Sequence, residues 1–370
     1  MTVPLLDLAA QHQEVADEVD IGIADVFRRT AFVGGPEVGE FEREYAAYVG
    51  TEHCIGAGNG TDALELALRA VGVTPGGEVV LPANTFIATA EAVSRIGARP
   101  VLVDVDDEHL LIDPDQVASA ITSRTQAIVP VHLFGQTAFV ERVREAVGDT
   151  GIPVVEDAAQ AQGALRHGRA AGSLGVVAAT SFYPGKNLGA AGDAGAVTTD
   201  DPQVAETVRL LAAHGSPTKY VHDVVGMNSR LDTVQAVYLR AKLSRLEKWN
   251  ELRREAAARY EELLGALPDV RLPRSAEGNR DVWHLYVVRT PHRDRMAAAL
   301  TEHGIGVGIH YPTPLHLTGA YAHLGIGPGA HPVAERASRE ILSLPMFPHL
   351  TADQQEKVAA GVEAALRRSS

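Results

Sequence analysis

The stretches IPVVEDAAQAQGA (residues 152–164) and VVAATSFYPGKNLG (176–189) decide the fold. Each opens with a short, almost wholly apolar run and then turns polar, as a strand buried on both faces does where it ends. Similar runs occur at EVVLPA (78–83), ARPVLVDV (98–105), QAIVPVHLFG (126–135) and AGAVTTD (194–200). Helical stretches separate the earlier runs, so the pattern predicts an α/β fold with a large, mostly parallel sheet.

A second region begins after Asp232, where neither proline nor glycine interrupts a helical pattern until Gly265. We expect one long helix there, linking a large domain (1–245) to a small α+β domain (246–370). The small domain is predicted to contain a strand at 281–290, a helix at 292–304 and a strand at 305–316 that runs into a loop. Its last helix is expected to open at Thr351, where Thr-Ala-Asp-Gln has the spacing of a capping box.

The composition excludes several classes of protein. The chain has 370 residues, with 47 acidic residues against 33 basic ones, and its net charge of −14 argues against nucleic-acid or anionic-membrane partners. Cys54 is the one cysteine, so an intrachain disulfide and a cysteine-built metal site are excluded, and no metal is expected. The amino-terminal sequence has no long apolar run, and we expect a cytoplasmic protein.

A glycine-rich turn opens the helical stretch in GAGNGTDALELAL (56–68). The free backbone N–H groups and the positive dipole end of such a helix can hold an anion, so Gly60 and Thr61 could cradle a phosphate. The glycine spacing fits neither a Walker A sequence nor a dinucleotide fingerprint. On this stretch alone, an ordinary capped helix explains the residues as well.

Two charged side chains are expected at the same edge of the sheet. Asp157 ends one apolar run, and Lys186 stands isolated in a loop that follows the next one. Separately, Asp157 could cap a helix and Lys186 could be an exposed loop residue. Together with a phosphate cradle, they are what pyridoxal phosphate requires, because the lysine forms the Schiff base and the carboxylate keeps the pyridine nitrogen protonated.

With these residues in view, the chain resembles the DegT/StrS-type nucleotide-sugar aminotransferases from about residue 4 to residue 350. The ordered matches include LDLAAQ (6–11), GNGTDALELAL (58–68), VVEDAAQAQGA (154–164), SFYPGKNLGAAGDAGAV (181–197), GMNSRLDTVQA (226–236) and HYPTPLH (310–316). The resemblance implies a fold-type I, pyridoxal phosphate-dependent transferase with the aspartate aminotransferase architecture. It also implies a homodimer with shared active sites.

The resemblance assigns roles to single residues. It implies that Lys186 carries the cofactor and shuttles the proton, that Asp157 binds the pyridine nitrogen, and that Gln160 binds the ring hydroxyl. Phe86 would stack on the ring, and Asn228 would reach the phosphate from the other subunit. The phosphate contacts within one subunit would be Gly60, Thr61 and Ser181. Core packing for Phe86 and a turn cap for Asn228 remain the alternatives.

The motif FYPGKNLGA-GDAG resembles the members that aminate C3 of dTDP-linked 3-keto-6-deoxyhexoses, using L-glutamate and releasing 2-oxoglutarate. The same analogy places six residues at the substrate: Tyr183, Lys219, Tyr220, His310, Tyr311 and His316. Solvated or structural roles for the histidines remain open, as do amination at C4 or of a cyclitol ketone. A non-catalytic regulator is a further alternative, whereas Lys186 argues against the related dehydratases, which have histidine in its place.

Overall fold

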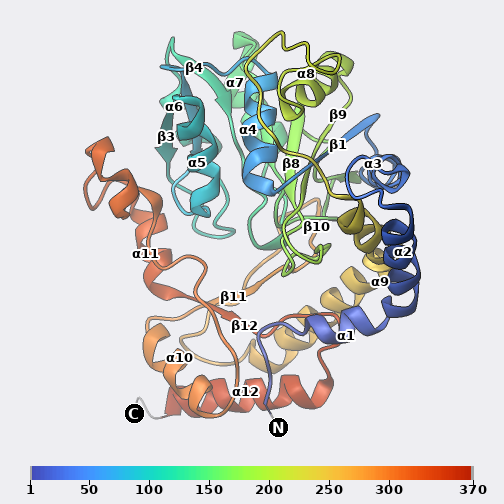
Figure 1. Ribbon diagram of the computed structural model, residues 1–370. Helices are drawn as coiled ribbons and strands as arrows, with labels where there is room; N and C mark the ends of the chain where they lie inside the picture. Colours follow the sequence, from blue (N-terminus) through green and yellow to red (C-terminus); the bar gives the residue numbers. More distant parts are fainter. Residues whose placement is uncertain (1, 368–370) are drawn as a thin grey trace.

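The computed structural model describes residues 2–367 and is built around a twisted sheet (Figure 1). The strands follow the order β3 (Arg99–Val103), β2 (Glu78–Pro82), β4 (Thr125–Ile128), β5 (Val155–Asp157), β8 (Val177–Ser181), β9 (Gly195–Thr199) and β1 (His53–Ala57). Parallel bridges from Ile128 to Val154 and from Val131 to Asp157 join β4 to β5. Only β9 among these strands runs against its neighbours, which confirms the prediction of a mostly parallel sheet.

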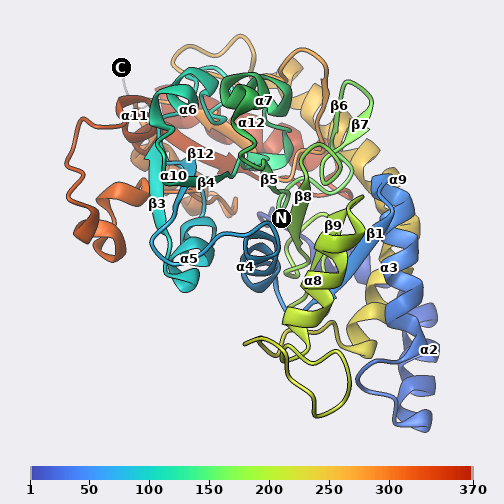
Figure 2. The same ribbon diagram turned by 90° about the horizontal axis from the view of Figure 1, so that it is seen from above.

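Helices cover both faces of this sheet, as Figure 2 shows from above. Along β2, Val79 and Leu81 pack into one core cluster and Val80 into another, because successive side chains of a strand point to opposite faces. The first cluster lies with α4 (Gly60–Ala70), α5 (Ile87–Ile96) and α8 (Pro202–Ala212), and the second with α6 (Pro114–Ala120) and α7 (Val140–Val147). Burial on both faces explains the continuous apolar runs of the sequence.

A single helix, α9 (Thr233–Leu264), runs from the sheet to the carboxyl-terminal part of the chain, as predicted. That part contains the antiparallel pair β11 (Tyr286–Arg289) and β12 (Ile341–Leu344), with α10 (Arg293–Glu302), α11 (Pro332–Glu340) and α12 (Ala352–Arg367). At the start of α12, Gln354 N donates to Thr351 Oγ1 and Thr351 N donates to Gln354 Oε1, which confirms the capping box. Because α9 is continuous through residue 245, the domain boundary at that position stays a prediction.

The remaining elements are helices near the amino terminus and short pieces. The helices are α1 (Leu8–Gln13), α2 (Ala16–Arg29) and α3 (Pro36–Val49), and the short strands are β6 (Leu165–Arg166), β7 (Arg169–Ala170) and β10 (Asn279–Arg280). Short 3-10 helices lie at η1 (Leu133–Gly135), η2 (Gly148–Thr150), η3 (Leu315–Leu317) and η4 (Gly319–Leu324). Residues 2–6 lie beside the carboxyl-terminal part, where Val3 N donates to Gly304 O and Gly306 N donates to Val3 O.

Residues 305–316 were predicted as a strand that runs into a loop, and the strand part is wrong: in the described chain this segment forms only the single bridges Val3–Ile305 and Gly308–Ser343. Two prolines in this segment lack the N–H that a ladder needs, and Gly306 lies so close to residues 4–5 that a Cβ would come within 2.7 Å of Leu5 N. The strand predicted at 281–290 shortens to β11, because Trp283 takes a left-handed conformation with φ of 46°.

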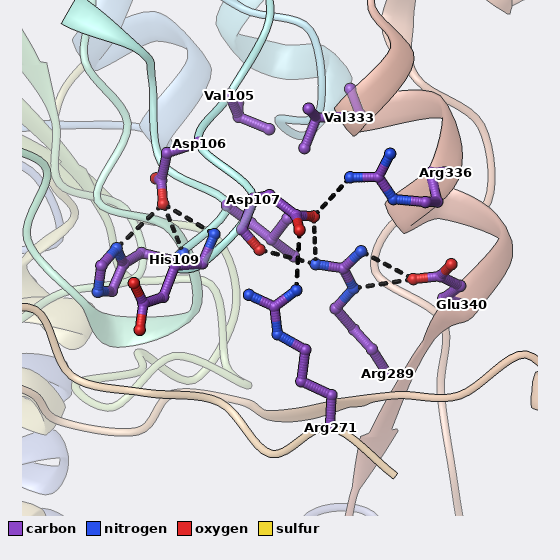
Figure 3. A network of polar contacts seen from close by, with 12 residues as sticks. Val105, Asp106, Asp107, His109, Arg271, Arg289, Val333, Arg336 and Glu340 are labelled. Atoms are coloured by element: carbon purple, nitrogen blue, oxygen red, sulfur yellow. Dashed lines mark hydrogen bonds and ion pairs between the residues drawn. The ribbon is translucent and has the colours of Figure 1, made fainter. Parts of the chain in front are cut away.

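Ion pairs join the loop after β3 to the carboxyl-terminal part (Figure 3). Asp107 accepts hydrogen bonds from Arg271 at 2.9 Å, from Arg289 at 2.8 Å and from Arg336 at 2.7 Å. Burial alone would raise the pKa of Asp107, but the three guanidinium groups hold it far below its usual value. Arg289 also donates to Glu340, so the β3 loop is fixed against both β11 and α11.

Candidate active site

A cavity of about 460 Å³ opens where β5 and β8 end. Open sheets of this kind place ligands at the carboxyl ends of parallel strands. Most of the residues predicted to form a site line it: Gly60, Thr61, Phe86, Asp157, Gln160, Ser181, Tyr183, Lys186, His310 and Tyr311. The cavity therefore brings together residues that lie up to about 250 positions apart, as the sheet topology requires.

Lys186 reaches the cavity from the loop that follows β8. Its N–H donates to Tyr183 O at 2.8 Å, closing a turn over Pro184 and Gly185. The turn is tight, because a Cβ at Gly189 would lie 2.2 Å from the carbonyl oxygen of Pro184. Burial lowers the pKa of the Lys186 amine to about 8, against the opposing influence of the Asp157 charge. Roughly a tenth of this amine is therefore neutral at pH 7, far more than for an ordinary lysine, and the neutral form can act as a base or nucleophile.

Asp157 and its neighbour Glu156 point to opposite faces of β5. The carboxylate of Asp157 accepts from Thr89 Oγ1 at 2.8 Å and from Ala159 N at 3.2 Å, and it faces the cavity. Each carboxylate oxygen can accept about two hydrogen bonds, so Asp157 keeps acceptor capacity for a cation or a protonated ring nitrogen. A charge 8% exposed is costly unless it is paired, which favours such a partner.

The amino terminus of α4 forms one wall of the cavity. Asn59 caps the helix by accepting from Asp62 N at 2.8 Å, and helix geometry leaves the N–H groups of Gly60 and Thr61 without intrahelical partners. A Cβ at Gly60 would lie 2.5 Å from the Cβ of Ser181, so only glycine allows the two backbones to approach this closely. The N–H groups and the helix dipole together suit a phosphate.

An aromatic and amide cluster faces these groups. Phe86 is half exposed, and its ring centroid lies 5.3 Å from that of Tyr311. Gln160 Oε1 accepts from Phe134 N at 2.7 Å, which turns the amide nitrogen toward Tyr311 Oη at 3.0 Å. Burial raises the pKa of Tyr311 to about 12, so its hydroxyl stays protonated.

Two histidines behave differently. His310 lines the cavity with its Nδ1 2.8 Å from Ser343 Oγ, and burial beside Lys186 lowers its pKa, so the ring is neutral. His316 was predicted at the substrate but does not line the cavity in the described chain. Its ring is 2% exposed and its Nε2 lies 3.0 Å from Glu335 Oε1, because residues 315–317 turn inward as a short 3-10 helix.

Three more predicted residues lie outside the single-chain cavity. Lys219 and Tyr220 stand in the loop after α8, where Tyr220 is 82% exposed and the lysine Nζ lies 5.1 Å from its ring centroid. Asn228 is exposed at the end of that loop and pairs with Ala213 through a single bridge. One chain alone therefore leaves these side chains without a place in the cavity.

Sequence reasoning missed three kinds of cavity residue. Thr89, one helical turn beyond Phe86, binds Asp157, and the spacing along the predicted helix could have indicated it. His284 lines the cavity and packs its Nδ1 3.2 Å from Asn187 Oδ1, but the strand pattern at 281–290 concealed it. Leu5 and Leu6 come from the far end of the chain, and their sequence carries no signal for this contact.

These groups fit pyridoxal phosphate as a set. The cavity offers an amine of lowered pKa at Lys186, an acceptor at Asp157, free N–H groups at α4 and an exposed aromatic face at Phe86. Within residues 2–367, no cluster of three or more His, Cys, Asp or Glu side chains could hold a metal ion. Nor does that part of the chain contain a helix long and apolar enough to cross a membrane.

Comparisons with known proteins agree with this geometry. The chain is 47% identical over 360 residues to the dTDP-3-amino-3,4,6-trideoxy-alpha-D-glucose transaminase of Streptomyces venezuelae, covering 97% of this chain and 95% of that one. It is also 47% identical to the "Erythromycin biosynthesis sensory transduction protein EryC1" of Saccharopolyspora erythraea, covering 98% and 100%. The crystal structure of S. venezuelae DesV in complex with a ketimine intermediate superposes with a TM-score of 0.96 at 47% identity, covering 98% of both chains.

The model of the DegT/DnrJ/EryC1/StrS aminotransferase family matches residues 14–363, nearly the whole chain. The matched span contains the lysine loop, the strand that ends at Asp157 and the amino terminus of α4. The chain therefore belongs to the DegT/DnrJ/EryC1/StrS aminotransferase family and is a pyridoxal phosphate-dependent sugar aminotransferase of fold type I.

Proposed function

We propose that this enzyme transfers an amino group from L-glutamate to C3 of a dTDP-linked 3-keto-6-deoxyhexose. The observation that carries the proposal is the single cavity in which Lys186 and Asp157 meet beside the free N–H groups of α4. The nucleotide and the sugar carbon rest on the 47% identity to the S. venezuelae transaminase. Extensive coverage of both chains supports carrying over the class of substrate.

Lys186 is the proposed Schiff-base residue and proton carrier. Its Nζ, whose neutral form is accessible near neutral pH because burial lowers its pKa to about 8, takes the proton from Cα of glutamate. In the second half-reaction, the same Nζ delivers a proton to C3 of the sugar. This two-stage transfer predicts ping-pong kinetics, because one enzyme form carries the amino group between the two substrates.

Asp157 is proposed to hold the proton on the pyridine nitrogen, with Thr89 fixing one of its oxygens. When bound, pyridoxal phosphate supplies an electron sink for the bond that breaks at Cα. Gln160 would donate its amide N–H to the ring hydroxyl, since its Oε1 is already occupied by Phe134 N. Phe86 would pack on the ring face, and Gly60, Thr61 and Ser181 would bind the phosphate.

We further propose a homodimer in which each subunit completes the other's site. Asn228 would bind the phosphate of the partner's cofactor, and Lys219 and Tyr220 would approach the nucleotide sugar beside Tyr183, His310 and Tyr311. The exposed positions of Asn228, Lys219 and Tyr220 support this arrangement. Apolar side chains exposed in the same loop, among them Val225 at 84%, also favour a covering partner.

A non-catalytic regulator is the second candidate, because the S. erythraea relative is named a sensory transduction protein. The lowered pKa of the Lys186 amine and the oriented carboxylate of Asp157 favour catalysis, since binding alone does not require a base. Amination at C4 of the sugar or of a cyclitol ketone is the remaining alternative within the family.

Transfer of isotope from 15N-glutamate to the sugar distinguishes these possibilities. The holoenzyme would be incubated with dTDP-3-keto-6-deoxyhexose or with the 4-keto isomer, and the labelled position would be read by NMR. Label at C3 with turnover of the first sugar only is the expected result. Label at C4 from the 4-keto sugar alone would show that the proposed substrate is wrong. A cyclitol ketone would be tested as a third acceptor, and absence of label with all three acceptors would favour the regulator.

A further inference from the structure

The segment that follows Lys186 is bound by polar side chains of α9. Gln235 Oε1 accepts from Ala191 N at 2.8 Å, and its Nε2 donates to Ala191 O at 3.2 Å. Lys242 Nζ donates to Gly189 O at 2.8 Å. These contacts hold the loop's backbone three and five residues beyond the reactive lysine.

A third contact extends the row. Asn187 Nδ2 donates to Asn250 Oδ1 at 2.9 Å, and it also donates to Val282 O at 2.9 Å. The three helix residues lie seven and eight positions apart, which is about two turns each, so they share one stripe of α9. They meet residues 191, 189 and 187 in that order, so helix and loop run in opposite directions along a matched series of contacts.

Two members of this row are buried at sites where an apolar side chain would cost less. Lys242 is 2% exposed and Asn250 is fully buried. Burial, together with the charge of Arg253, lowers the pKa of Lys242 to about 8. Its Nζ also lies 5.8 Å from the ring centroid of Trp249. A buried amine and amide carry a free-energy cost unless they are hydrogen-bonded. Lys242 binds the lysine loop, and Asn250 joins that loop to Gln162, to whose carbonyl oxygen its Nδ2 donates at 2.9 Å.

We infer that Gln235, Lys242 and Asn250 are positioning residues that hold segment 187–191 and thereby fix the amine of Lys186 in the cavity. The inference rests on the proposed role of Lys186. The turn on the amino-terminal side is closed by its own N–H to Tyr183 O. On the other side, the α9 row adds to the backbone hydrogen bond from Ala190 N to Phe182 O at 2.7 Å, so that the amine reaches the reacting carbons in one position rather than an ensemble.

The test is hydrogen-deuterium exchange of the holoenzyme carrying Lys242→Met, which keeps the length and removes the donor. Peptides covering residues 183–192 should exchange about five- to tenfold faster, while strand β8 and helix α9 keep their protection. The fall in turnover should appear in kcat rather than in KM for glutamate. Lys248→Met is the matched control, because that lysine of α9 is exposed, pairs with Glu14 at 3.6 Å away from the lysine loop, and should leave both readouts unchanged.

Gln235→Leu keeps the test decisive if the buried variant does not fold, since Gln235 lies only partly inside the protein. It should accelerate exchange at Ala191 and its neighbours about threefold and lower kcat less than Lys242→Met does. Unchanged exchange at 183–192 in a folded Lys242→Met or Gln235→Leu enzyme would overturn the inference. Because exchange is measured without turnover, failure of the proposed substrate would leave this result intact.

Discussion

The two faces of the sheet use their buried carboxylates in opposite ways. On the core side, Glu156 accepts from His132 Nε2 at 2.7 Å and from the backbone N–H groups of Gly172, Leu174 and Gly175. On the cavity side, the adjacent Asp157 has fewer partners and faces open space. One carboxylate is saturated and structural, whereas the other is held in place but left able to bind, which is what separates a core residue from a site residue here.

Lys186→Ala should cause the largest loss of activity and should leave stability nearly unchanged. Removal of the base and of the covalent attachment should lower kcat by at least about 10⁴-fold, with the thermal unfolding midpoint nearly unchanged. The variant should still bind pyridoxamine phosphate through Asp157 and α4, as equilibrium dialysis would show. Multiple-turnover amination by Lys186→Ala would remove this lysine from its proposed role.

Replacement of each carboxylate by its amide should separate stability from activity. Asp157→Asn should lower kcat by about 100-fold or more, because the pyridine nitrogen loses its anion. Its free energy of unfolding should change by less than about 1 kcal/mol, since Thr89 can accept from the new amide while donating to Thr85. Kinetics and chemical unfolding of the same sample measure both quantities.

Glu156→Gln should show the reverse pattern. The amide places its own N–H₂ against backbone N–H donors in a fully buried site, so unfolding should become easier by about 3 kcal/mol. The enzyme that remains folded should keep most of its turnover rate. If the two amide variants gave the same pattern, the distinction between the two faces would fail.

The contrast between Glu156 and Asp157 also shows how far the sequence predicts this molecule. The apolar runs, the isolated Lys186 and the turn at Gly60 identify the floor of the cavity because strand ends and helix starts are local features. These local patterns do not distinguish Glu156 from Asp157, since either carboxylate could cap a helix or bind a ligand. The faces of β5 become distinct only when His132 and the loop at residues 172–175 pack against one of them.

The substrate side was less predictable. His316 resembles a ligand residue in HYPTPLH, yet it packs against Glu335 nineteen positions away. Residues 305–316 were predicted as a strand running into a loop, but packing of Gly306 against the amino-terminal segment replaces the strand's ladder. Leu5 and Leu6 reach the cavity only through that tertiary contact, which no local pattern encodes.

Cofactor attachment on the cavity side should depend on pH through Lys186. A neutral amine is required at Lys186, so the rate of pyridoxal phosphate attachment to cofactor-free protein should rise with pH and level off above about 8. A free lysine, with its pKa near 10.5, would still be gaining reactivity there. Stopped-flow absorbance checks the midpoint, and a midpoint near 10 would mean that Lys186 is not buried as described.

The contribution of Glu156 to stability should change with pH in the acid range. Burial alone would raise the pKa of Glu156, but the hydrogen bonds from His132 and the backbone N–H groups hold it below its usual value. Its contribution to stability is therefore present above the unfolded pKa of about 4.5 and is lost as the pH falls through the lower folded pKa. On acidification, the free energy of unfolding should fall more in the parent enzyme than in Glu156→Gln. Equal decreases would contradict the lowered pKa assigned to Glu156.

Asn228→Asp should have the smallest effect and tests the proposed partner contact. A negative charge beside the cofactor phosphate should weaken pyridoxamine phosphate binding about three- to tenfold, and less so at high salt. Asn228→Ser is the control, because it removes the amide without adding charge. Equal affinity for the parent and the aspartate variant at low salt would place Asn228 away from the phosphate.

The most direct measurement of the central claim is an absorbance spectrum taken in one cuvette through a full cycle. The band of the lysine-bound cofactor should fall when L-glutamate is added and return when dTDP-3-keto-6-deoxyhexose follows, because Lys186 releases and then recovers the cofactor. Bleaching by glutamate without recovery on addition of the sugar would contradict the proposed substrate. A protein supplied with pyridoxal phosphate that shows no such band would contradict the role of Lys186 itself.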